Sequence, residues 1–213
     1  MALRAGADAL CEKPLVINPW NLDALENLER ETGCRVFTVL QLRTHPQLIA
    51  LREKLLAQAY GRRRRVVLTY VTSRGPWYHV SWKGTEEKSG GIATNIGIHF
   101  FDLLIWLFGK PGRCAVTTHE PLRMAGEFEL ENADVCWSLS VDRADVPREA
   151  RERGRTTFRS ITIDGEDVEF SEGFTELHTE VYRRTLAGDG FGIAAARPSV
   201  ELVHGLRAKL AKP

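Results

Sequence analysis

Short motifs that mark the commonest catalytic and cofactor sites are missing from this sequence of 213 residues. There is no GxGxxG between a predicted strand and a helix, no Walker loop, no GxSxG, no HExxH and no calcium-binding loop. The only glycine pair, Gly90-Gly91, follows a predicted loop rather than a strand. These absences exclude a self-contained dinucleotide site, a serine hydrolase elbow and a zinc protease helix of the common kinds.

Cysteine is scarce, and its four residues stand singly, with no CxxC and no close histidine pair. Such spacing favours reduced thiols over a disulfide framework or a zinc site, and it is typical of a cytoplasmic protein. We therefore expect no metal and a cytoplasmic location. The cysteines are Cys11, Cys34, Cys114 and Cys136.

An excess of one charge is also missing, because 29 Lys and Arg residues face 28 Asp and Glu residues and leave a net charge of +1. Proteins that bind nucleic acid or anionic membranes carry a basic excess. We interpret the basic run Arg62–Arg65 as a solvated turn. The apolar stretch Ile92–Phe108 contains polar residues that are costly in hydrocarbon, so we interpret it as a buried helix. We expect neither a nucleic-acid nor a membrane partner.

The first part of the chain has the pattern of a strand, a helix and a second strand. Ala7–Cys11 is a short apolar strand, and Asn18 then caps a helix that ends at Gly33. Arg35–Leu42 is apolar on both faces, which predicts a central strand covered on both sides. This order is a βαβ unit, and such units build parallel sheets.

The second part predicts an antiparallel sheet with helices. A helix over His45–Ala57 leads to a strand over Arg65–Thr72, and the long apolar helix follows an aromatic loop. Strand-like runs without intervening helices then form a meander, with Asp164-Gly165 as a two-residue hairpin turn. Helices over Thr175–Leu186 and at the C-terminus close the chain. The five runs are Arg113–Thr118, Met124–Leu130, Asp134–Val141, Thr157–Ile163 and Val168–Ser171.

The long apolar helix carries a narrow polar stripe. Asn95, His99, Asp102 and Trp106 follow one another at i, i+4, i+7 and i+11. Burying an amide, an imidazole and a carboxylate costs several kcal/mol unless each finds a partner. A satisfied core network would be one explanation, with Asp102 capping a backbone group and His99 bonded to a carbonyl. Three polar groups on one line favour a functional site.

Other candidates lie where strands end. Lys13 follows the first strand, at the edge where α/β sheets bind ligands, and burial there would lower its pKa. A solvated loop lysine is the alternative. Gln41 and Arg43 end the second strand in the same way. The loop from Arg74 to Lys83 offers cations and aromatic surfaces for a sugar nucleotide, although a loop packed on its own aromatics fits equally well. His178 is a minor candidate.

Three motifs together resemble one family. Glu12-Lys13-Pro14-Leu15 resembles its EKP motif, Leu42–Pro46 resembles its arginine-and-proline turn, and Ser89–Asp102 resembles its glycine-to-histidine active-site helix. This is the glucose–fructose oxidoreductase/inositol dehydrogenase (Gfo/Idh/MocA) family of NAD(P)-dependent sugar dehydrogenases. The resemblance covers essentially the whole chain.

Within that family, three segments look closest to the UDP-N-acetylglucosaminuronate 3-dehydrogenases. They are Gln41–Arg43, Thr72–Tyr78 and Ser81–His99. Those enzymes oxidise the C3 hydroxyl of the sugar for bacterial surface polysaccharides. The resemblance thus implies NAD as the cofactor, a UDP-sugar as the substrate, and a homo-oligomer built through the open face of the antiparallel sheet.

The resemblance also implies roles for single residues. His99 would be the general base, and Lys13 would stabilise negative charge on the same oxygen. Many members have aspartate where this chain has Asn95, so Asn95 would position the substrate instead of forming an Asp–His pair. We expect a cis Lys13–Pro14 peptide. The remaining expected substrate-binding residues are Arg43, Arg74, Tyr78 and Lys83, and the expected cofactor-binding residues are Glu12, Lys13, Pro14 and Gln41.

The implied fold class is α/β followed by α+β. Residues 1–43 would be the C-terminal remnant of a Rossmann-like nucleotide-binding domain. Residues 44–213 would be a substrate-binding and oligomerisation domain, with a mostly antiparallel open sheet, helices on one face and a C-terminal helix able to pack back on the first domain. Because the glycine fingerprint is missing, we expect the 213 residues alone to be inactive. The alternatives are another sugar or polyol dehydrogenase of the family, or a non-catalytic fragment that binds a sugar nucleotide or self-associates.

Overall fold

The computed structural model describes residues 2–58, 62–75, 77–168, 170 and 175–210. Its first part is the predicted parallel unit, in which β1 (Ala9–Cys11) pairs with β2 (Val36–Thr38) around α1 (Pro19–Thr32). The helix begins after an extended Asn18 with Pro19 in its first turn, and it ends at Gly33 in the left-handed conformation, with φ 73°. The predicted start and end of this helix are confirmed.

The second strand is shorter than the predicted Arg35–Leu42. After Val39, whose N–H still donates to the carbonyl of Cys11, the backbone turns at Leu40, and η2 (Gln41–Thr44) follows as a 3₁₀ helix. The apolar residues after β2 are buried without strand pairing, so their hydrophobicity was a signal of burial and not of a longer strand. The turn places Gln41 and Arg43 against the rest of the molecule.

The second part contains a six-stranded sheet in the order β4-β5-β6-β3-β7-β8. Every neighbouring pair is antiparallel except β3 and β6, which run parallel. The mostly antiparallel sheet is therefore confirmed. Its strands are β3 (Arg64–Thr72), β4 (Pro111–His119), β5 (Arg123–Leu130), β6 (Ala133–Ser140), β7 (Thr157–Ile163) and β8 (Glu166–Asp167).

The end of the sheet differs from the prediction. The hairpin turn at Asp164-Gly165 is confirmed, with φ 53° and 90°, but β8 has only two residues and does not lie over Val168–Ser171. The chain leaves the edge because Phe170 turns into the core, where its ring lies 6.4 Å from the rings of His45 and Phe100. Residues 169 and 171 of that predicted strand lie outside the described residues.

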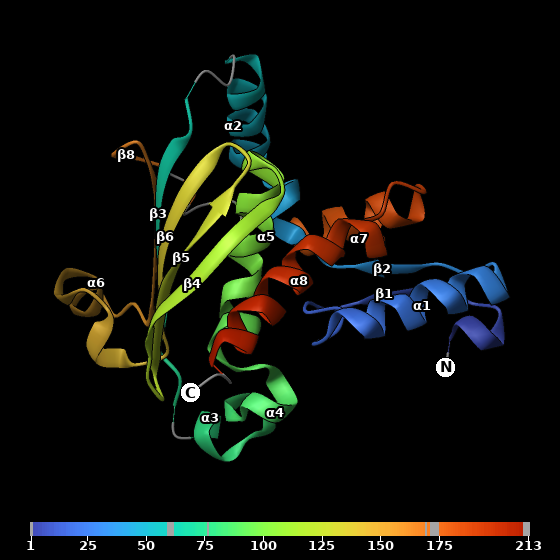
Figure 1. Ribbon diagram of the computed structural model, residues 1–213, viewed down its shortest axis with the longest axis horizontal. Coiled ribbons are helices and arrows are strands. Elements are labelled where there is room, and N and C mark those ends of the chain that lie inside the picture. Colours follow the sequence, from blue (N-terminus) through green and yellow to red (C-terminus); the bar gives the residue numbers. More distant parts are fainter. Residues whose placement is uncertain (1, 59–61, 76, 169, 171–174, 211–213) are drawn as a thin grey trace.

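Helices cover one face of the sheet, as predicted. Figure 1 shows the sheet nearly edge-on, with α5 (Ile98–Phe108) and α8 (Ile193–Leu210) between it and the β1–α1–β2 unit. Side chains that point toward these helices, such as Phe128 and Trp137, are buried, whereas Val67 on the opposite face is 37% exposed. The remaining helices are α2 (Pro46–Ala57), α3 (Trp77–Val80), α4 (Glu86–Ser89), α6 (Arg148–Glu152) and α7 (Leu177–Leu186).

Helix α8 joins the two parts of the molecule. It packs on β4 and α5 of the large part and on α1 and β2 of the small part. Near its end, the guanidinium of Arg207 donates to the carbonyl of Ile17 at 3.1 Å. The C-terminal helix thus packs back on the first part of the chain, which fixes the first strands relative to α5.

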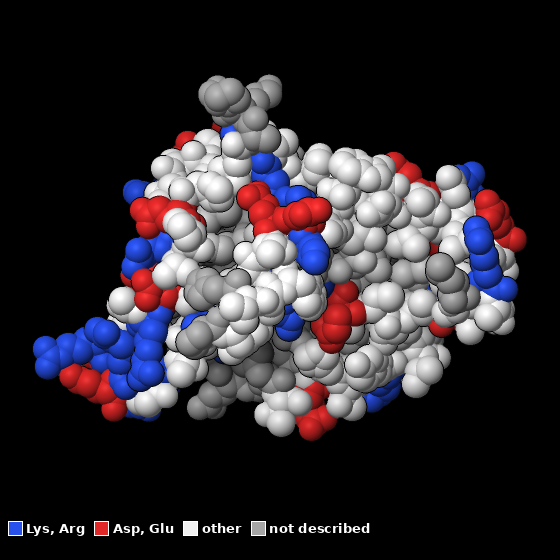
Figure 2. All heavy atoms as spheres, turned by 90° about the horizontal axis from the view of Figure 1, so that it is seen from below, with Lys and Arg blue, Asp and Glu red and all other residues white. Residues whose placement is uncertain are grey.

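The segment Glu86–Phe108 is long and apolar enough to cross a membrane by length and composition, but 72% of its most apolar window is buried inside the structure. A core helix of a soluble protein passes the same test. Figure 2 shows groups of both signs scattered over one face between broad uncharged areas, and a concentration of basic side chains, with acidic ones beside them, at the end of the molecule where α6 lies.

Candidate active site

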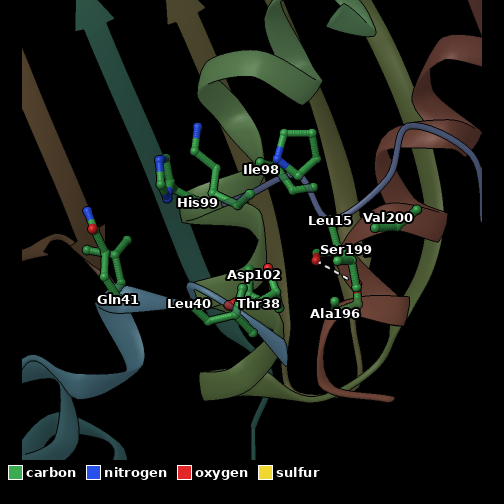
Figure 3. A pocket seen from close by; sticks show the side chains of 13 residues that line it. Leu15, Thr38, Leu40, Gln41, Ile98, His99, Asp102, Ala196, Ser199 and Val200 are labelled. Atoms are coloured by element: carbon green, nitrogen blue, oxygen red, sulfur yellow. Dashed lines mark hydrogen bonds between the residues drawn. The ribbon is translucent and has the colours of Figure 1, made fainter. Parts of the chain in front are cut away.

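A pocket lies where β1 and β2 end against the first turn of α5 (Figure 3). His99 and Asp102 reach it from α5, Gln41 from η2, and Ser199 from α8. Lys13 also lines the pocket, from the loop that follows β1. Parallel strands bind ligands at their carboxyl ends, and this pocket occupies that position.

Lys13 is held against the turn that directly precedes α5. Its Nζ donates to the backbone carbonyl of Asn95 at 2.8 Å, and the Lys13–Pro14 peptide is cis, as predicted. Burial lowers the pKa of Lys13 from 10.5 to about 8, Glu12 opposes this shift, and Arg74 and Lys83 add to it. A lysine with a pKa of about 8 is partly deprotonated near neutral pH, whereas a solvated loop lysine stays protonated.

Asn95 lies in η4 (Ala93–Gly97), a π-helical turn directly before α5. Such turns are rare and are often found at functional sites. The side-chain amide donates to the hydroxyl of Tyr78 at 3.3 Å and to the carbonyl of Lys83 at 3.2 Å. Gly97 allows the turn to lie on the sheet, since a Cβ there would come within 2.7 Å of Leu139. Asn95 therefore ties the aromatic loop to the catalytic helix.

His99 is in the first turn of α5. Desolvation lowers the pKa of His99 well below 6.5, and the positive charges of Lys13, His178 and Arg159 lower it further. The imidazole is therefore neutral near pH 7, which is the form that accepts a proton.

Two further residues, Arg159 and His178, lie close enough to His99 to influence its pKa. Arg159 of β7 pairs in register with Tyr70 of β3, whose ring lies 4.6 Å from that of Phe100. His178 at the start of α7 approaches Glu12, with Nε2 3.3 Å from Oε1. Their charges reach His99 from elements that are distant in the sequence. One sequence signal could have identified Arg159. It lies two residues from Ile161 on the same strand, on the face that points toward the helices, where an apolar residue is expected.

Arg43, which the sequence predicts to bind substrate, makes its described contacts inside the protein. Its guanidinium makes two bonds to the carboxylate of Asp102, Nε to Oδ2 at 2.9 Å and Nη2 to Oδ1 at 2.7 Å. It also donates to the carbonyl of Ala195 at 3.1 Å and lies over the ring of Phe191. Burial raises the pKa of Asp102, and Arg43 opposes that shift. The pair is buried and internal, so Arg43 holds η2 and α8 against α5.

The expected loop residues meet beside Asn95. Tyr78 is buried, and burial raises the pKa of its hydroxyl. The positive charge of Arg74 lowers the pKa of both Tyr78 and Lys13. The Nε atom of Arg74 is buried and has no hydrogen-bond partner among the described residues. Lys83 has its ammonium 5.7 Å from the ring centre of Trp82. Lys13, Asn95, His99, Tyr78, Arg74 and Lys83 thus form one connected cluster.

Two buried polar atoms without a partner in the described part of the chain lie on the side of the pocket formed by the strand ends. Thr38 Oγ1 and Gln41 Oε1 are buried there without a hydrogen-bond partner among the described residues. Buried polar atoms are rarely left unpaired, and a carboxamide has both a donor and an acceptor. Within the described ranges, no three His, Cys, Asp or Glu side chains are grouped so as to hold a metal ion.

Comparison with known proteins agrees with this geometry. Residues 65–145 match the family model for the Gfo/Idh/MocA oxidoreductases, described as the C-terminal alpha/beta domain. The WlbA (WbpB) dehydrogenase of Thermus thermophilus, solved in complex with NAD and UDP-GlcNAcA, is 56% identical over 97% of this chain, with a TM-score of 0.91. The chain belongs to the Gfo/Idh/MocA oxidoreductase family. Its fold is that of the family's C-terminal part.

Two curated members of the Gfo/Idh/MocA family match more weakly. Myo-inositol dehydrogenase Hyg17 of Streptomyces leeuwenhoekii is 32% identical over 110 residues, which is 51% of this chain. Inositol 2-dehydrogenase of Rhizobium meliloti is 26% identical over 131 residues, which is 59% of this chain. The chain spans 32% and 38% of the lengths of these two relatives, and 66% of the Thermus dehydrogenase.

Proposed function

We propose that this chain carries the substrate-binding part of an NAD-dependent dehydrogenase that oxidises the C3 hydroxyl of UDP-N-acetylglucosaminuronate. The observation that carries the proposal is that a half-buried His99 of lowered pKa lines one pocket with a lysine of lowered pKa, at the carboxyl ends of β1 and β2. The 56% identity to a dehydrogenase solved with NAD and UDP-GlcNAcA supports this substrate. A role in bacterial surface polysaccharide synthesis is part of the same proposal.

In the proposed reaction, His99 removes the proton of the C3 hydroxyl. Bound NAD supplies the hydride acceptor. Lys13 lies beside the same oxygen and stabilises its developing negative charge, while the Asn95 carbonyl holds the lysine in place. The low pKa of His99 keeps it in the accepting form, and the cations around it favour loss of its proton to solvent after turnover.

The cations around the cluster are proposed to bind the anionic groups of the substrate. Arg74 and Lys83 suit the diphosphate, and Arg159 suits the uronate carboxylate because it borders His99 from β7. Tyr78 and Asn95 would orient the sugar ring. Glu12, Lys13, Pro14 and Gln41 are the proposed cofactor contacts, with Gln41 Oε1 as the acceptor for the carboxamide.

The remaining parts of the proposal concern organisation. We assign residues 1–43 to the end of a nucleotide-binding domain and residues 44–213 to the substrate domain. Copies of the chain would associate through the open face of the sheet, where Val67 and Cys136 are exposed side chains. We place the protein in the cytoplasm, with no nucleic-acid or membrane partner.

A second candidate substrate is an uncharged polyol such as myo-inositol, which the identity to Hyg17 favours. A third outcome is that the chain binds a sugar nucleotide without catalysis, since it spans 66% of the Thermus dehydrogenase. The cations near His99 favour a charged substrate over inositol.

A chimera tests these candidates. The N-terminal third of Thermus WlbA is fused ahead of this chain, and NADH formation is measured with UDP-N-acetylglucosaminuronate and with myo-inositol. We expect NADH from the UDP-sugar only, and none from the 213-residue chain alone. Turnover of inositol without turnover of the UDP-sugar would replace the proposed substrate. A folded chimera that turns over neither compound would support the third outcome, in which the chain binds a sugar nucleotide without catalysis.

A further inference from the structure

Two tryptophans near the catalytic helix are open to solvent. Trp77 is 49% exposed and Trp82 is 58% exposed, whereas Trp137 in the sheet is 3% exposed. The ammonium of Lys83 lies 5.9 Å from the ring centre of Trp77 and 5.7 Å from that of Trp82. We call these three residues the tryptophan platform. Two exposed indole rings that share one cation provide flat apolar surface beside a positive charge.

The tryptophan platform is fixed to the catalytic helix. The carbonyl of Lys83 accepts from the amide of Asn95 at 3.2 Å, and the same amide donates to Tyr78 at 3.3 Å. The ring of Trp77 meets that of Tyr78 edge to face, with centroids 6.0 Å apart. Asn95 thus links the platform and Tyr78 to the turn that directly precedes His99.

The charges along this path fit a diphosphate. The positive charge of Arg74 lowers the pKa of Lys13 and that of Tyr78. Its buried Nε has no hydrogen-bond partner among the described residues. Lys83 follows at the platform itself. Neither tryptophan lines the pocket that contains Thr38 and Gln41.

We propose that the base of a nucleoside diphosphate stacks on Trp77 and Trp82, with Lys83 against its phosphates. The inference rests on the proposed function, in which the substrate is a UDP-sugar with its sugar at His99. A base has a π-face that stacks on an indole without directional hydrogen bonds, and aromatic platforms bind bases in this way. The platform would supply affinity for the nucleotide while the Lys13–His99 pair performs the chemistry.

Calorimetric titration of the 213-residue chain with UDP, uridine and pyrophosphate tests the proposal. We expect Trp82→Ala and Trp77→Ala each to weaken UDP binding by about 5- to 150-fold, the range measured for base stacking. Lys83→Gln should weaken UDP and pyrophosphate but leave uridine unchanged. Trp20→Ala is the matched control, because Trp20 is 56% exposed on α1, and it should bind UDP normally.

Three results would overturn the platform. They are no UDP binding by the unsubstituted chain, UDP affinity unchanged in both tryptophan variants, and tryptophan variants that alter the oligomer mass and not UDP affinity. The last result would make the patch a contact between copies of the chain. The chimera separates the two proposals: full turnover of the UDP-sugar by its Trp77→Ala/Trp82→Ala variant sinks the platform alone, and an inactive unsubstituted chimera with intact UDP binding sinks the reaction alone.

Discussion

Two groups of polar residues about one turn apart along α5, the Asp102 end and the Lys13–His99 end, differ in how well their polar atoms are paired. At Asp102, two bonds from Arg43 complete a buried ion pair, and Ser199 adds a further bond. One turn earlier, His99 is desolvated and faces positive charges, and Lys13 is held at a pKa of about 8. Both ends look alike in the sequence. Buried polar groups that are fully paired within the protein indicate a structural role. Buried ionisable groups whose charged form is disfavoured indicate a ligand-binding site.

The comparison predicts that the two ends respond oppositely to substitution. Loss of a partner at the Asp102 end should cost stability, because it leaves a buried charge alone. Loss of a group at the Lys13–His99 end should lower activity but change the free energy of unfolding little. Folding partly removes these groups from water, and that unfavourable desolvation disappears with the side chain.

The largest effect is expected for His99→Ala in the chimera. Loss of a general base lowers kcat/KM by about 10²- to 10⁴-fold. UDP-sugar binding should remain measurable by titration. His119→Ala, on the exposed end of β4, is the control and should keep full activity. Normal turnover by His99→Ala would remove His99 from the mechanism.

Asp102→Ala should give the largest loss of stability. Breaking a buried ion pair costs about 3–5 kcal/mol because the remaining charge is unpaired. Urea denaturation measures the loss, and the double variant Arg43→Leu/Asp102→Ala should lose less than the sum of the two single variants. Additive losses would show that the two side chains do not act as a pair.

Lys13→Met should abolish most turnover yet raise the free energy of unfolding at pH 7. A pKa lowered from 10.5 to about 8 corresponds to at most about 3 kcal/mol, and the bond to Asn95 is lost in return. Between pH 8 and 10.5 the unfolded chain binds more protons at Lys13 than the folded chain, so stability of the unsubstituted chain should rise with pH in that window. The variant should lack this rise, and an identical pH dependence would contradict the burial of the charge.

The smallest effect on fold and site is expected on the open face of the sheet. Val67→Lys should change the free energy of unfolding by no more than about 0.5 kcal/mol, since surface substitutions rarely do more. It should nevertheless dissociate the proposed oligomer, as measured by light scattering. An unchanged oligomer mass would place the interface elsewhere.

Local sequence signals were sufficient where the chemistry is local. Asn18 and Gly33 marked the ends of α1, and alternation with turn residues marked the antiparallel strands. The spacing of Asn95 and His99 placed both residues on one line of a helix, whereas their proximity to Lys13 was implied by the family resemblance.

Long-range pairing could not be read in this way. Arg43 and Asp102 are 59 residues apart, and nothing in either segment shows that they would meet. The register that brings Arg159 to the site depends on where β7 joins β3. Leu40 and Leu42 were interpreted as strand residues because burial in a turn and burial in a strand leave the same apolar pattern.

The arrangement of the loop between β3 and η4 has an evolutionary consequence. Arg74, Trp77, Tyr78, Trp82 and Lys83 come from one uninterrupted stretch, whereas Lys13 and His99 come from elsewhere. Asn95 links Lys13 to that stretch, through its backbone carbonyl on one side and its side-chain amide on the other. Recombination or insertion confined to that stretch would exchange ligand preference as one inherited module. A lineage could therefore diversify its substrates while the proposed proton-transfer pair, Lys13 and His99, descends unchanged.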